Sequence, residues 1–146
     1  MRHLWILLSL LLLACNPAVP NPQTIQSVTF THTTGTVSPQ YWRKWTLAVN
    51  RDLSTHYTEM DFQDKVLQEK SGKTTQAQFS ALAKSLEAAD YTRVKSTKLD
   101  PMPVGGGSST LSVKTDKGSY GFDGPSTYTF PPAIGTVFES KDQFMP

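Results

Sequence analysis

Cysteine is nearly absent from this 146-residue chain, which contains only Cys15, and there are only three histidines. One cysteine excludes an internal disulfide framework and a cysteine-rich zinc module. The longest apolar run, Leu4–Leu13, is about half of the roughly 20 residues that a membrane-spanning helix needs. The charge is nearly balanced, with 14 Lys and Arg against 12 Asp and Glu. This balance argues against nucleic acid as a partner.

The apolar residues are concentrated at the N-terminus. Residues 1–14 hold eleven of the 55 apolar residues, whereas the 132 residues from Cys15 onward are only 33% apolar. Arg2 and His3 precede the leucine run, and the small residue Ala14 stands directly before Cys15. A short basic start followed by a leucine run of this length is typical of a signal peptide.

The order of charge, leucine run, small residue and cysteine resembles the lipobox of bacterial lipoproteins. The resemblance implies a signal peptide at residues 1–14, cleaved between Ala14 and Cys15. It also implies a diacylglycerol, and further acyl groups such as palmitate, on Cys15. Asn16, where an Asp would favour the inner membrane, implies an outer-membrane lipoprotein facing the periplasm. Two alternatives are an ordinary secretory signal with an incidental cysteine and an anchor helix, although Asn16 and Pro17 end the apolar run.

A proline-rich tether is predicted to follow the cysteine. Residues 16–22 contain three prolines, a composition that disfavours helix and central strand and favours an extended spacer of roughly 20 Å. We therefore expect a lipidated cysteine and tether at residues 15–23 and a single domain at residues 24–146.

The pattern within this domain predicts strands on both sides of one helix. Thr75 and Gln78 form a capping box, and Phe79, Leu82 and Leu86 follow at helical spacing, so we expect a main helix at about residues 75–90. Ile134, Val137 and Phe138 indicate a short C-terminal helix. Alternating or β-rich segments predict strands at 25–34, 41–49, 55–62, 65–70, 110–114, 119–122 and 127–130.

These elements predict an α+β fold in which the main helix covers one face of an antiparallel sheet. Two local details are also expected. Thr92 and Val94 indicate a return to β structure after the helix, and Gly118 is predicted to occupy the left-handed position of a hairpin turn.

The layout resembles a group of small bacterial domains exemplified by emfourin, an inhibitor of thermolysin-like metalloproteases. Those domains have a strand and Gly-containing loop, a Trp-bearing strand, a strand pair, a helix of the type A-x-x-L-x-x-A-L-x-x-A-x-(F/Y), a second Gly-containing loop and a T-x-x-V hairpin. The corresponding stretches here are Val28–Gly35, Trp42–Val49, Phe79–Tyr91 and Gly105–Gly121. The resemblance implies the same fold and offers protease inhibition as an alternative function.

No catalytic or metal-binding motif accompanies the histidines of the domain. His32 and His56 lie in Thr-rich strands, outside HExxH and G-x-S-x-G contexts. Glu59 and Asp61 share a strand face, but no glycine-rich calcium loop surrounds them. We therefore predict no catalytic residues, no metal site and no cofactor, and keep a small hydrolase using His32 or His56 as a weaker alternative.

The candidate binding features are a glycine-rich loop and an aromatic strand end. Gly105, Gly106 and Gly107 lie in a long irregular segment that could carry recognition. Trp42 is expected to be a partly exposed aromatic that could contact a partner, whereas Trp45 is expected in the core. The sequence thus predicts a lipid-anchored, non-enzymatic envelope protein that binds the membrane through Cys15 and a protein partner, either an envelope protein or a protease.

Overall fold

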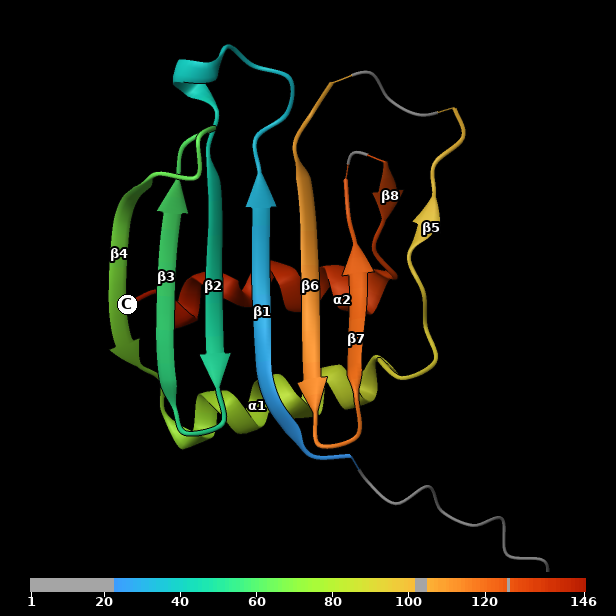
Figure 1. Ribbon diagram of the computed structural model, residues 1–146. Helices are drawn as coiled ribbons and strands as arrows, with labels where there is room; N and C mark the ends of the chain where they lie inside the picture. Colours follow the sequence, from blue (N-terminus) through green and yellow to red (C-terminus); the bar gives the residue numbers. More distant parts are fainter. Residues whose placement is uncertain (1–22, 102–104, 126) are drawn as a thin grey trace, which may run out of the picture.

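The computed structural model describes residues 23–101, 105–125 and 127–146 (Figure 1). Ala14, Cys15 and nearly all of the predicted tether lie outside the described residues. A six-stranded antiparallel sheet has the order β4-β3-β2-β1-β6-β7. Its strands are β1 (Ile25–Thr33), β2 (Lys44–Asn50), β3 (Ser54–Met60), β4 (Val66–Lys73), β6 (Ser108–Thr115) and β7 (Ser119–Asp123).

Two α-helices and two short 3-10 helices complete the fold. Helix α1 (Gln76–Ala88) and helix α2 (Pro132–Glu139) both lie on one face of the sheet (Figure 1). The 3-10 segments are η1 (Pro39–Tyr41) and η2 (Ser140–Phe144). The short strands β5 (Thr97–Lys98) and β8 (Tyr128–Thr129) pair with each other beside β7. This arrangement confirms the α+β class, the main helix and the C-terminal helix.

The core forms where the inward side chains of the three central strands meet in register. Val28 of β1 lies opposite Val49 of β2 and Val113 of β6. The next inward row is Phe30 between Leu47 and Leu111. All six side chains are fully buried. Because successive residues of a strand face opposite ways, this alternation sends Thr29, Thr31 and Thr33 of β1 to the other sheet face, where they are half-buried.

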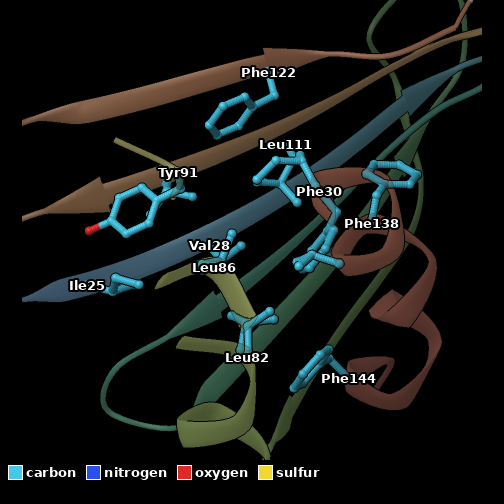
Figure 2. Packing of buried hydrophobic residues seen from close by; sticks show 14 of the residues in the cluster. Ile25, Val28, Phe30, Leu82, Leu86, Tyr91, Leu111, Phe122, Phe138 and Phe144 are labelled. Carbon is cyan, nitrogen blue, oxygen red and sulfur yellow. The ribbon is translucent and has the colours of Figure 1, made fainter. Parts of the chain in front are cut away.

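The helices bury their apolar sides against this layer. Thr75 caps α1 with the predicted box, accepting from the Gln78 backbone N–H at 3.1 Å. Phe79, Leu82 and Leu86 of α1 are buried. The ring of Phe30 meets Phe138 of α2 edge-on at 5.9 Å and stacks with Phe144 of η2 at 6.4 Å (Figure 2). The aromatic contacts of Phe30 therefore join the C-terminal segment to the central strand.

Several predicted strands are shorter than expected: the strand at 25–34 ends at Thr33 and the one at 127–130 is only Tyr128–Thr129, and two others lose residues to turns. The strand expected from Tyr41 begins at Lys44, because Ser38 and Pro39 start the 3-10 helix η1. The strand expected to reach Phe62 ends at Met60. Asp61 ends it, since its Oδ1 accepts hydrogen bonds from the backbone N–H groups of Gln63 and Lys65.

Two local predictions were wrong. Thr92 and Val94 lie in no strand, because the chain turns at Asp90 (φ 51°), whose carbonyl accepts from the Val94 N–H at 3.1 Å. Gly118 is not left-handed; the hairpin is closed by Thr115, whose Oγ1 accepts from the Gly118 N–H at 3.1 Å. A side-chain acceptor thus replaces the glycine conformation that the turn was expected to use.

Phe138→Ala should lower the free energy of unfolding by about 3–5 kcal/mol, since it removes a buried ring packed on Phe30 and Trp45. Phe62→Ala is the matched control and should change it by less than about 0.5 kcal/mol, because the Phe62 ring is 52% exposed. Urea denaturation followed by circular dichroism measures both. Equal losses in the two variants would contradict the core described above.

Candidate functional site

Three connections emerge side by side at the end of the sheet opposite the start of β1. Thr33, the last residue of β1, lies opposite both Lys44 and Ser108, and Lys44 lies opposite Met60. The register therefore brings together the loop 34–43, the turn 61–65 and the segment leading into β6 (Figure 1). We call this the distal end, because the nine residues of β1 place it about 30 Å from Ile25, the end of β1 that the predicted tether precedes.

Large apolar side chains are exposed at the distal end. Val37 is 46% exposed, Tyr41 66% and Phe62 52%. We call these three residues the distal patch. Exposed apolar groups that gather at one end of a domain, on loops held by a rigid sheet, are typical of interaction sites.

Arg43 fixes the loop that carries Tyr41. Its Nη1 donates to the backbone carbonyls of Gln40 at 3.0 Å and Trp42 at 2.7 Å. Its Nε lies 3.5 Å from Oε1 of Glu59 on β3. Glu59 also accepts the hydroxyl hydrogen of Tyr57 at 3.2 Å, and partial burial followed by the Glu59 charge raises the pKa of Tyr57. Loop and strand are thus joined by one polar network, which presents Tyr41 on an ordered turn.

The glycine segment packs closely against the β1–β2 connection. A Cβ on Gly35 would lie 2.0 Å from the Gly106 carbonyl oxygen, and one on Gly107 would lie 2.7 Å from Cε1 of His32. Gly105 and Gly106 have φ of +80° and +95°, which residues with a side chain rarely adopt. These glycines allow two backbones to touch at the distal end. Residues 102–104, which directly precede these glycines and belong to the predicted binding loop, lie outside the described residues.

The two neighbouring tryptophans have different environments. Trp45 packs on the core side, 6.4 Å from the Tyr57 ring and 6.3 Å from the Phe138 ring, which agrees with its predicted place. Trp42 directly follows η1 and is half-buried at the distal end. Of the predicted binding residues, Trp42, Gly105, Gly106 and Gly107 are therefore brought to the same end of the sheet.

The distal patch was not predicted, because the sequence alternation continues through Tyr41 and Phe62 and so placed both in strands. The signals that could have revealed it are turn signals. Pro39 favours the first position of a helical turn, and Asp61 can cap the backbone of a tight turn. Pro39 and Asp61 end the strand pairing, so Tyr41 and Phe62 lie in exposed connections instead of strands.

His32 lies on the helix-side face of the sheet, near the distal end. Its Nδ1 is 3.0 Å from Oγ of the buried Ser109, and its ring centroid is 5.8 Å from that of Trp45. Partial burial lowers the pKa of the His32 imidazole, and the Lys141 charge lowers it further. The surroundings thus favour a neutral ring that packs and hydrogen-bonds.

His56 lies on the open face of the sheet between two residues of β4. Its Nδ1 is 3.1 Å from Ser71 Oγ, and its Nε2 is 3.1 Å from Glu69 Oε1. These residue types occur in hydrolases, but here the side chains of His56 and Glu69 are 45% and 60% exposed. Catalytic sets are usually enclosed in concave sites that exclude water. The geometry favours a cross-strand polar contact.

Within residues 23–101, 105–125 and 127–146, no three His, Cys, Asp or Glu side chains come together as a metal site. No helix in these same ranges is both long and apolar enough to span a bilayer. Comparison with known proteins finds no matching family model and no significant match among curated proteins. The geometry of the described residues therefore carries the functional argument.

The stability of the fold should fall partly through His32 as the pH drops below about 7. Well above pH 6.5, which is the ordinary pKa of the imidazole, the ring is neutral in both states. As the pH falls, the unfolded chain, whose His32 has the higher pKa, takes up the proton first, so unfolding is favoured. His32→Gln should flatten this part of the stability profile in urea titrations at several pH values. An unchanged profile would show that His32 binds protons equally in both states.

Proposed function

We propose that this protein is a lipid-anchored, non-enzymatic domain of the bacterial cell envelope that binds a protein partner through its distal end. The observation that supports this most is the position of the distal patch. Val37, Tyr41 and Phe62 are exposed at the end of the sheet opposite the start of β1, where the tether enters. A domain anchored through Cys15 would hold this patch away from the lipid surface.

The chemistry of the patch supports a protein as the partner. Aromatic side chains are enriched in protein interfaces because they bury much area at little cost in conformational entropy. Tyr41 is also held in place by the Arg43 network, so little loop ordering is required on binding.

Inhibition of a thermolysin-like protease is the second candidate. The observation that favours it is the same loop, because a backbone held by hydrogen bonds that exposes a side chain is what an inhibitor presents to an enzyme cleft. An assay of thermolysin with the purified chain at micromolar concentration separates the two proposals. If the chain inhibits thermolysin and the Tyr41→Ser variant does not, the inhibitor proposal is favoured. If thermolysin keeps its full activity, binding to an envelope protein remains the proposed function.

Lipidation is tested separately by labelling. Cells fed an alkyne fatty acid should label the wild-type chain, and Cys15→Ser should abolish the label because the thiol is the attachment atom. The label is detected by click chemistry on a gel. A labelled Cys15→Ser chain would reject the anchor, and an unlabelled wild type would do the same.

Photo-cross-linking in cells tests the distal patch. A photoreactive amino acid at position 41 or 62 should give a discrete adduct with another protein, because both side chains are exposed at the distal end. The same amino acid at Thr92, exposed in the turn that follows α1, serves as the matched control and should give none. Adducts of equal yield at all three positions, or none at 41 and 62, would refute the proposed surface.

A further inference from the structure

We propose that the outer edge of β4 takes up an extended acidic segment of a protein partner, which adds to the sheet as a further strand. The proposal rests on the proposed protein-binding function and names how such a partner is held. It concerns the edge of the sheet rather than the distal patch, so the two can fail independently.

The two edges of the sheet differ in their covering. On β7, the Asp123 N–H donates to Ser96 Oγ at 2.8 Å, and Tyr120 meets the Tyr91 ring edge-on at 5.2 Å. The chain between α1 and β5 therefore runs beside β7 (Figure 1). On β4, every residue except Gly72 is exposed, and among the residues that the structure describes the strand pairs only with β3. Its outward backbone groups are a template for another strand.

The start of β4 offers apolar contacts to such a segment. Val66 is 50% exposed and Leu67 46%, and Phe62 of the distal patch precedes them by a few residues. On the inner face, Gln68 and Lys70 border a small hollow with Tyr57, Met145 and Pro146. An added strand could place one side chain there, beside Met145, which is 43% exposed.

The charges of β4 select an acidic partner. Lys65, Lys70 and Lys73 line this edge, and among the described residues none of them lies within ion-pair distance of a carboxylate, although the charge of Lys73 also acts on Asp52. The one acidic residue of the strand, Glu69, is engaged with His56 at 3.1 Å. Lys70 pairs with Tyr57 of β3, whose side chain lies on the inner face of the sheet, and Lys73 pairs with Ser54, whose side chain lies on the open face. The two lysines therefore lie on opposite faces of the sheet. Two carboxylates three residues apart on an extended chain would likewise point to opposite faces and meet both lysines.

A second copy of this chain is the less favoured occupant of the edge. Antiparallel pairing of two β4 strands would reverse the strand direction of the second copy. The β1 strands of the two copies would then start at opposite ends of the joined sheet. Two chains arranged in this way and anchored through Cys15 could not both reach the same leaflet with short tethers. Lysines and a bulge between Glu59 and Met60 also oppose indiscriminate edge pairing.

The test uses the full chain in mild detergent and a fluorescein-labelled peptide, Thr-Glu-Thr-Thr-Glu-Thr-Val-Thr-Val-Thr. Anisotropy should show saturable binding. The variant Lys70→Glu/Lys73→Glu should bind about tenfold more weakly and should instead bind a peptide in which both Glu are Lys. The matched control Lys84→Glu/Lys95→Glu reverses two exposed lysines away from the edge and should bind as the wild type does. Thermal melts verify that each variant is folded.

A second peptide tests the backbone pairing. N-methylation of alternate residues of the peptide removes the backbone N–H donors along one of its two edges. The peptide methylated along the edge that faces β4 should not bind. Equal binding of the methylated and unmethylated peptides, no binding at all, or no effect of Lys70→Glu/Lys73→Glu would each overturn the proposal. So would a concentration-dependent dimer in sedimentation that the β4 variant dissociates, since the edge would then hold a second copy. Cross-linking at positions 41 and 62 reports on the distal patch regardless of these results.

Discussion

The pairing of β1 with both β2 and β6 is the constraint on which the rest of this domain depends. β1 is the first strand of the described residues, yet it lies at the centre of the sheet and joins two hairpin-connected halves. Its partner β6 is separated from it by more than half of the described chain. The rows that begin at Val28 and Phe30 form only when all three strands are in register, and both helices pack on those rows. Such long-range pairing is slow to form because its loop-closure entropy is lost before the contacts are gained.

This central placement also determines what is left for function. With the core side of the sheet occupied by α1 and α2, the part of the chain that the structure describes offers the distal end, the hydroxyl-rich open face and one unpaired edge. The distal patch and the β4 edge meet near Phe62 and Val66, where the β3–β4 turn enters the edge strand. A partner that contacted both would be held by aromatic burial and by backbone pairing at once. Either contact alone is small, but two linked contacts strengthen one another through effective concentration.

Periodicity predicted most of the fold because one face of each element is buried. Val28 and Phe30, the Leu82 and Leu86 pair of α1 and the Ile134 group of α2 all follow the expected spacing. The strand ends could not be predicted in this way. At Tyr41 and Phe62 the alternation continues past the point where Pro39 and Asp61 turn the backbone, so local turn chemistry decided the boundary. The covering of β7 could not be predicted either, since it depends on the Tyr91–Tyr120 contact, which joins distant segments.

The central position of β1 has a mechanical consequence for an anchored domain. A pull on the tether would act along β1 from its Ile25 end, parallel to its two neighbours. Its hydrogen bonds to β2 and β6 run across the strands, so they would be loaded together in shear. Were the tether joined to an edge strand at the end of its ladder, the bonds could open one at a time, as in a zipper. In a domain anchored as we propose, the strand that organises the core would therefore also be the one best placed to resist force from the anchor.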